Sequence, residues 1–322
     1  MQSEKSTPLG HWKEARIRPI LAAALLLVCA LLDGCAWLDI KQRELALRPT
    51  PGRPAQYAEG SAALKAAFGA DDLRWLQPLP ATEPGAPPQQ LALWWLPQPD
   101  PAAPALLYLH GTFRNLYQNL PKIQALRQAG FAILAVDYRG WGDSSAIVPS
   151  EESIDADARV AWAALVQRQP MAGRRVIYGH SMGGAAAVTL ASTLHEGSDY
   201  GALVLESTFT RLADVAEAAG FWGRVGAAVS TLQFDSLSRI GRVDAPILIL
   251  HGAADRTVPI DLGQRLREAA PRGARWVAIP GGSHSGLQRD APELYQKTFT
   301  ELVSRLPRPL DQPAVSTTTH KP

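Results

Sequence analysis

Between residues 72 and 280 the chain alternates short apolar runs with longer segments of helical character. The runs are LRWLQP, LALWWLP, ALLYLHG, FAILAVDYRG, RVIYGHS, ALVLEST, PILILHG and RWVAIPG. Only a proline-rich turn separates the first two, which predicts an antiparallel pair, whereas the later runs are separated by segments long enough for crossover helices. Because the later runs are almost continuously apolar, we expect helices to cover both faces of their sheet. The pattern predicts an α/β fold with a mostly parallel sheet.

Polar residues that could carry chemistry follow these runs. In parallel α/β sheets, ligands and reactions gather beyond the carboxyl ends of the strands. The residues that follow the runs are His110, Gly111, Thr112, Asp137, Ser181, Glu206, Asp255 and His284. A serine, several acids and a histidine are therefore expected to share one edge of the sheet.

Ser181 stands in the stretch VIYGHSMGGAAAVTL, between a strand-forming run and an alanine-rich helix. A sharp turn at this place would expose the hydroxyl, and Gly179 and Gly183 would remove side chains that collide there. The helix that follows would direct its amino end at the site, so that the Met182 N–H becomes a donor to a developing oxyanion. A glycine and serine cluster also occurs by chance in loops, but here its context predicts a nucleophile.

A serine nucleophile needs a base and an acid that orients the base. His284, in a glycine-rich loop after the last run, is the predicted base, with an exposed loop histidine as the alternative. Asp255 gives the chain order serine, aspartate, histidine and is the predicted acid, with Glu206 as the rival. Asp137 is predicted to be a structural acid that fixes its own loop.

The second oxyanion donor should come from the loop LHGTFRN. Gly111 would let the Thr112 N–H approach a substrate oxygen, and Phe113 is the second choice. No metal site is predicted, because the histidines are not spaced as ligands with cysteines or with one another. No cofactor is predicted either, since the chain has no P-loop or dinucleotide glycine pattern. The 32 basic and 30 acidic residues are scattered, so the charge names no nucleic-acid partner.

The amino terminus has the layout of a signal peptide. Basic residues precede an apolar stretch from Pro19 to Leu32, which is short for a membrane span. The stretch ends in LLDGC, which resembles a bacterial lipobox apart from Asp33, and this predicts a lipid anchor on Cys35. Ala36 resembles an outer-membrane sorting signal. These residues predict a protein of the bacterial cell envelope that faces the periplasm, with an uncleaved anchor or an ordinary signal peptide as alternatives.

The motifs LHGTFRN, DYRGWGDSS, GHSMGG, LESTFT, FDSLSRI, HGAADRTVP and GGSH together resemble the α/β-hydrolase family, in the branch of membrane-associated depalmitoylase-like serine hydrolases. The resemblance covers roughly residues 70 to 305. It implies an eight-stranded, mostly parallel sheet, no cofactor, and a covalent acyl-enzyme at Ser181. It also implies a short lid at about 211–242, which could be an acyl-binding wall or a packed helix pair over the sheet edge.

These observations divide the chain into a signal peptide (1–34), a tether and strap (35–70), a hydrolase domain (71–305) and a disordered tail (306–322). The predicted function is hydrolysis of a carboxylic ester or thioester in a small-molecule or acylated substrate. A serine peptidase or amidase of the same fold is the first alternative, since the same residues cleave amides. A lipid-anchored binding protein that does not use the serine is the second.

Overall fold

The computed structural model describes residues 34, 36–80, 85 and 87–308. Within them, one eight-stranded sheet has the order β1-β2-β4-β3-β5-β6-β7-β8. Its strands are β1 (Leu73–Leu79), β2 (Gln89–Leu96), β3 (Ala105–Leu109), β4 (Ala132–Asp137), β5 (Arg175–His180), β6 (Ala202–Glu206), β7 (Ile247–Gly252) and β8 (Ala274–Ile279). Strand β2 pairs antiparallel with both β1 and β4, and all the other pairs are parallel. The predicted fold class is confirmed, including the antiparallel first pair.

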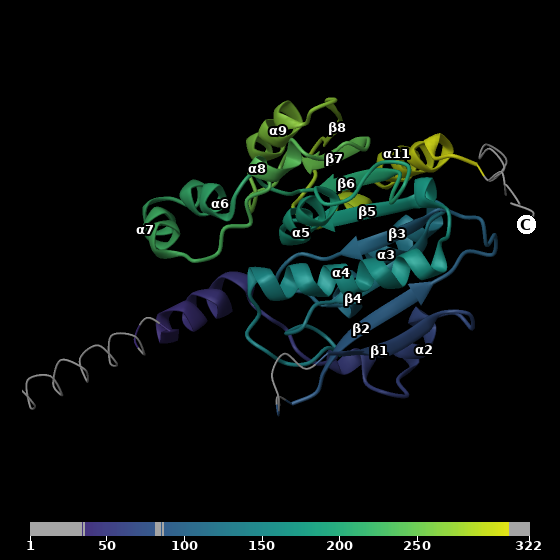
Figure 1. The fold of residues 1–322 in the computed structure, drawn as a ribbon, viewed down its shortest axis with the longest axis horizontal. Helices are drawn as coiled ribbons and strands as arrows, with labels where there is room; N and C mark the ends of the chain where they lie inside the picture. The colour runs from purple at the N-terminus through teal and green to yellow at the C-terminus, as the bar shows by residue number, and fades with distance from the viewer. Residues whose placement is uncertain (1–33, 35, 81–84, 86, 309–322) are drawn as a thin grey trace, which may run out of the picture.

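Helices cover both faces of the sheet (Figure 1). One face carries α4 (Glu151–Arg168), α5 (Met182–Ala191), α8 (Leu237–Ile240) and α9 (Ile260–Ala269). The other carries α2 (Ala62–Ala67), α3 (Leu116–Gln128), α10 (Leu287–Asp290) and α11 (Pro292–Arg305). There are also two short 3-10 helices, η1 (Ala55–Tyr57) and η2 (Ala172–Arg174). A further pair of helices is formed by α6 (Leu212–Ala218) and α7 (Phe221–Val229).

Strand β3 shows why both faces must be covered. All five of its residues are buried, and successive side chains point to opposite faces of a strand. Leu107 and Leu109 belong to one hydrophobic cluster, whereas Leu106 and Tyr108 belong to the cluster on the other face. A strand of this kind cannot leave either face in water without exposing a row of apolar side chains.

The segment 47–54 is held against the body. Leu47 is fully buried, Pro51 forms a β-bridge with Gly142, and the Arg53 guanidinium donates to Asp143 over 2.8 Å. A helix at residues 36–47 precedes it. The segment lies within the predicted tether and strap, and its position is fixed by buried apolar and polar contacts that a local sequence pattern does not reveal.

The predicted lid region contains α6, α7 and α8. Figure 1 places α6 and α7 beyond the carboxyl ends of the parallel strands, where the two helices pack against each other. The hydroxyl of Thr231, just after α7, donates to Asp39 in the amino-terminal helix over 2.6 Å. The predicted lid segment therefore contains a packed pair of helices, and its role as an acyl-binding wall stays a prediction.

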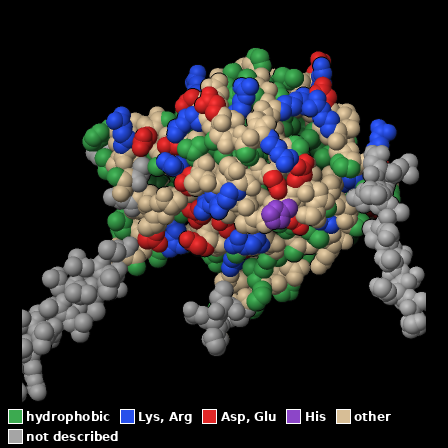
Figure 2. Space-filling view, turned by 45° about the horizontal axis from the view of Figure 1, so that its top comes forward, with side chains coloured by type: hydrophobic (Ala, Val, Ile, Leu, Met, Phe, Trp, Pro, Cys, Tyr) green, Lys and Arg blue, Asp and Glu red, His purple; other side chains and the backbone are tan. Residues whose placement is uncertain are grey.

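Three predictions about the chain ends lie outside the described residues. These are the signal peptide predicted at 1–34 apart from Gly34, the lipidated Cys35, and the tail predicted at 306–322 apart from residues 306–308. Among the residues that the structure does describe, no helix is long and apolar enough to cross a membrane. On the face drawn in Figure 2, acidic and basic side chains alternate without forming a field of one sign.

Candidate active site

Ser181 occupies the turn between β5 and α5. Its backbone has φ 54° and ψ −120°, a left-handed conformation that costs free energy for a residue with a side chain. The turn closes only because it is flanked by glycine. A Cβ on Gly179 would lie 2.2 Å from the Gly183 carbonyl oxygen, and a Cβ on Gly183 would lie 2.2 Å from the Leu109 carbonyl oxygen. The two predicted glycines therefore permit the close approach of β3, β5 and α5.

His284 lies between Ser181 and Asp255. Its Nε2 is 3.1 Å from Ser181 Oγ, and its Nδ1 is 2.8 Å from Asp255 Oδ2. If Nδ1 carries the proton and donates it to the carboxylate, Nε2 is free to accept the serine proton. The loop after β8 and the loop after β7 thus bring together three side chains that are separated by 74 and 29 positions in the sequence.

The Asp255 carboxylate is held in its ionised form. Burial opposes ionisation, but hydrogen bonds from His251 and His284 outweigh it and hold the pKa of Asp255 well below its usual range. The backbone N–H groups of Thr257 and Val258 also donate to its Oδ1, over 2.8 and 2.9 Å. Oδ1 is therefore used by the local turn, which leaves Oδ2 to orient the imidazole of His284.

Two backbone N–H groups beside Ser181 have no hydrogen-bond partner among the described residues. Neither the Thr112 N–H nor the Met182 N–H donates a hydrogen bond to another described residue. The loop that carries Thr112 passes directly beside the serine, since a Cβ on Gly111 would lie 3.1 Å from Ser181 Cβ. Phe113, the second choice for this role, has φ 50°. Two free donors beside a nucleophile can bind an oxyanion.

Glu206, the rival to Asp255, has other partners. It lies at the end of β6 and is fully buried, and its carboxylate forms an ion pair with Lys122. The hydroxyls of Tyr178 and Tyr295 donate to its Oε2 over 2.7 and 3.0 Å. These contacts use both carboxylate oxygens in the core on the α3 side, so the structure brings Asp255 and not Glu206 to His284.

Asp137 is buried at the end of β4. It contacts the start of α3 as well as the loop that follows its own strand. Its Oδ1 accepts a hydrogen bond from the Leu116 N–H, at the start of α3, over 2.8 Å. Its backbone oxygen accepts the Ser144 hydroxyl, and its Oδ2 lies so close to Gly142 of its own loop that a Cβ there would be 1.9 Å away. Burial raises the pKa of Asp137 to about 8, and burial lowers the pKa of the neighbouring His110 to about 4. Both side chains are therefore neutral in the folded protein near pH 6 to 7.

This pair predicts a pH-dependent stability. The raised pKa of Asp137 means that its contribution is complete below pH of about 4 and is lost as the pH rises to about 8. The lowered pKa of His110 acts in the opposite direction below about pH 6.5. The net loss should therefore appear between about pH 6.5 and 8, where it amounts to about 1 to 2 kcal/mol.

Asp137→Asn tests this, because asparagine keeps the acceptor for Leu116 and cannot ionise. Urea unfolding of both proteins at pH 6.5 and pH 8 should show the loss in the parent and a smaller one in the variant. Equal losses in the two proteins would mean that Asp137 does not titrate in this range.

His180, which directly precedes Ser181, is a residue of the site to which the sequence analysis assigns no role. Its ring is buried, and its Nε2 lies 3.0 Å from the His284 carbonyl oxygen. A Cβ on Gly111 would lie 3.0 Å from its Nδ1, so His180 fills the space between the oxyanion loop and the histidine loop. Burial and the nearby charge of Lys122 hold the pKa of His180 well below its usual value. The one feature of the sequence that could have indicated this role is the position of His180 directly before Ser181.

The sheet order, the strained serine after β5 and the histidine after β8 define a serine hydrolase of the α/β fold. No group of histidine, cysteine and acidic side chains that could hold a metal ion is present in the described part of the chain.

Comparison with known proteins gives the same class. Residues 100–239 match the family described as serine aminopeptidase, S33. An uncharacterised protein of Mycobacterium tuberculosis, Rv2307c, is 34% identical over 198 residues, which are 61% of this chain and 68% of that protein. Lysophosphatidylserine lipase ABHD12 of Danio rerio is 31% identical over 197 residues, 56% of this chain and half of that protein (50%). The esterase Pf2001 of Pyrococcus furiosus aligns with a TM-score of 0.59 at 18% identity, over 80% of this chain and 97% of the esterase.

The chain belongs to the α/β-hydrolase superfamily, and within it to the family that includes the mycobacterial protein. The archaeal esterase structure supports only the fold, because its sequence identity to this chain is low.

Proposed function

We propose that this protein hydrolyses a carboxylic ester or thioester through an acyl-enzyme at Ser181. The observation that carries the proposal is the continuous hydrogen-bonded row from Ser181 through His284 to Asp255, beside two free backbone donors. An unassisted serine hydroxyl is a poor nucleophile, and this arrangement supplies the base and the oxyanion donors that it needs.

In the proposed reaction, Ser181 Oγ attacks the carbonyl carbon while His284 Nε2 takes the hydroxyl proton. The oxyanion accepts hydrogen bonds from the N–H groups of Thr112 and Met182. His284 then gives the proton to the leaving alcohol or thiol as the bond to the carbonyl carbon breaks. Water repeats the sequence on the acyl-enzyme, releases the carboxylic acid and restores Ser181. Asp255 keeps the imidazole in the required tautomer and stabilises its charged form.

A peptidase or amidase is the second candidate. It is favoured by the matched family, whose description is that of a serine aminopeptidase. The ester proposal is favoured by a relative that is described as a lysophosphatidylserine lipase. The same side chains serve both reactions, since the leaving amine also takes its proton from the histidine.

The test uses the purified protein with a fluorophosphonate probe and two sets of substrates, p-nitrophenyl esters of increasing acyl length and aminoacyl p-nitroanilides. Labelling together with faster ester than anilide turnover is expected. Faster anilide turnover would replace the ester proposal with the peptidase. Folded protein that neither labels nor turns over either substrate would favour the binding protein that does not use its serine.

We further propose that the protein is held in the bacterial cell envelope by a lipid on Cys35, facing the periplasm. The support is the sequence from Pro19 to Cys35, with its apolar stretch and lipobox-like end.

A further inference from the structure

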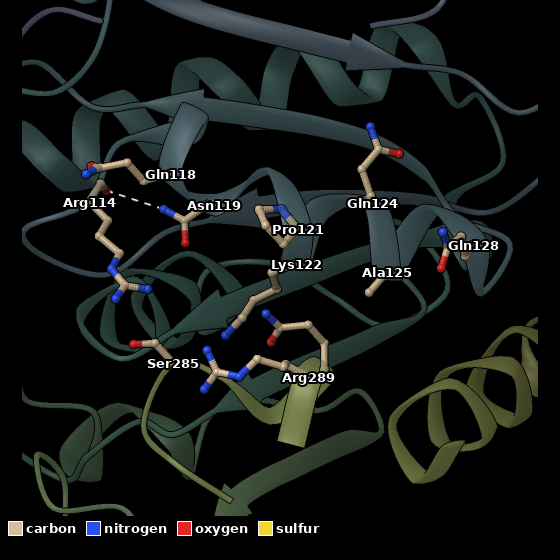
Figure 3. A pocket seen from close by; sticks show the side chains of 11 residues that line it. Arg114, Gln118, Asn119, Pro121, Lys122, Gln124, Ala125, Gln128, Ser285 and Arg289 are labelled. Carbon is tan, nitrogen blue, oxygen red and sulfur yellow. Dashed lines mark hydrogen bonds between the residues drawn. The ribbon is translucent and has the colours of Figure 1, made fainter. Parts of the chain in front are cut away.

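A cavity of about 390 Å³ lies between α3 and the segment that follows His284. Arg114 and Lys122 line it from one side, and Ser285, Gln288 and Arg289 line it from the other. Figure 3 shows the side chains of Arg114, Lys122 and Arg289 directed toward a common space. The volume is that of a small-molecule site. Three of its lining residues are cationic, none is acidic and none is aromatic, so the cavity suits a polar anion better than an acyl chain.

Two residues that line the cavity come from the loops that also carry residues of the candidate active site. Arg114 comes two residues after Thr112, the proposed oxyanion donor, and Ser285 directly follows His284. The His180 ring lies between the loop of Arg114 and the loop of Ser285, because it contacts the His284 carbonyl oxygen and packs close to Gly111. One ligand could therefore place a group in the cavity and an ester carbonyl at Ser181.

Two of the three cationic side chains already have an acidic partner within the protein. Lys122 is paired with the buried carboxylate of Glu206, and Arg289 donates to Asp290 over 2.9 Å. The guanidinium of Arg114 has no hydrogen bond or ion pair within the described residues. Arg114 therefore adds a positive charge that no acidic side chain of the described residues pairs with. Guanidinium groups bind phosphate oxygens in a bidentate manner.

A hydroxyl could also be recognised there. Gln288 lines the cavity, and its buried side-chain oxygen accepts no hydrogen bond within the described part of the chain. A buried amide oxygen without a partner costs free energy unless a ligand donates to it. The cavity thus offers a charged site for an anion and a neutral acceptor for a neighbouring hydroxyl.

We propose that this cavity is a phosphate subsite of the same active site, so that the preferred substrates are carboxylic esters that carry a phosphate group. This inference rests on the proposed ester hydrolysis and narrows its substrate class. The phosphate belongs to the substrate and enters between Arg114 and Arg289, while the ester carbonyl lies at Ser181.

The test compares two esters with the same acyl chain, hexanoyl glycerol and hexanoyl glycerol phosphate. The parent protein should favour the phosphate ester, and Arg114→Gln should lower kcat/KM for that ester about tenfold, mainly through KM. Arg289→Gln should act in the same direction. Neither variant should change the neutral ester more than about twofold. Arg267→Gln, on α9 across the sheet, is the matched control and should change neither ester.

Equal losses on both esters in the Arg114 and Arg289 variants would overturn the proposal, because these residues would then only support the catalytic loops. Unchanged kinetics on both esters would also overturn it. Inorganic phosphate that alters turnover of the neutral ester, with no preference for the phosphate ester, would assign the cavity to a free anion and overturn the substrate subsite.

Binding separates this result from the proposed function. Calorimetry with Ser181→Ala and hexanoyl glycerol phosphate needs no turnover, so the subsite can be tested even if ester hydrolysis fails. Loss of that binding in the Ser181→Ala, Arg114→Gln double variant is the expected outcome, and unchanged binding would count against the subsite.

Discussion

Ser181→Ala is expected to lower kcat for ester hydrolysis by a factor on the order of 10⁵ to 10⁶ and to abolish fluorophosphonate labelling. The variant removes the atom that forms the acyl-enzyme, while the oxyanion donors and His284 remain in place. Alanine can take the backbone conformation of Ser181 at a cost similar to that of serine, so the fold should be retained. Stopped-flow or steady-state assays with a p-nitrophenyl ester, together with a thermal unfolding scan, measure the two effects.

The matched control is Ser198→Ala, which changes an exposed serine in the turn after α5. Its activity and labelling should equal those of the parent. If Ser181→Ala folds and still turns over ester within about tenfold of the parent, the nucleophile lies elsewhere and the proposed mechanism is wrong.

Asp255→Asn should lower kcat by about 10⁴-fold while KM changes little. The asparagine oxygen can still accept the N–H groups of Thr257 and Val258, so the turn is preserved. The amide nitrogen then faces His284 and acts as a donor, which requires Nδ1 to be the unprotonated nitrogen. Nε2 would carry the proton and could no longer accept one from Ser181.

Asp199→Asn provides the comparison, because Asp199 also accepts a backbone N–H, from His195, far from the site. It should leave kcat unchanged. Retention of most activity by Asp255→Asn would remove this residue from the mechanism and reopen the role for another acid. An equal loss of activity and of folded protein would indicate a purely structural role.

Much of the fold could be predicted from the sequence, because each buried strand appears there as an apolar run. The residues at the ends of these runs then had to share one edge, so Ser181, Asp255 and His284 could be named before any coordinates. The sequence alone left Glu206 as a rival to Asp255, since Glu206 ends one strand and Asp255 closely follows the next. The decision lies in Lys122, Tyr178 and Tyr295, three distant residues that surround Glu206.

The rest of the site depends on contacts between segments that no local pattern links. The cavity joins Arg114 to Arg289 across the space between α3 and α10, and although Arg114 lies in the stretch LHGTFRN, nothing in that stretch points to Arg289. The contacts of the strap at 47–54 could not be predicted either, because its prolines and glycines leave no apolar periodicity. Its order comes from single contacts, such as the burial of Leu47 and the ion pair of Arg53 with Asp143.

The strap determines where a truncated form of the protein should begin. Asn115, the residue that caps α3 just after the oxyanion loop, donates its side-chain amide to the carbonyl oxygens of Thr50 and Gly52. A boundary at residue 71, which the motifs alone suggest, would discard both acceptors and leave the loop of Thr112 and Arg114 without its outer support. A truncated hydrolase should begin ahead of Leu47, since the catalytic unit includes a stretch of chain that carries none of its chemistry.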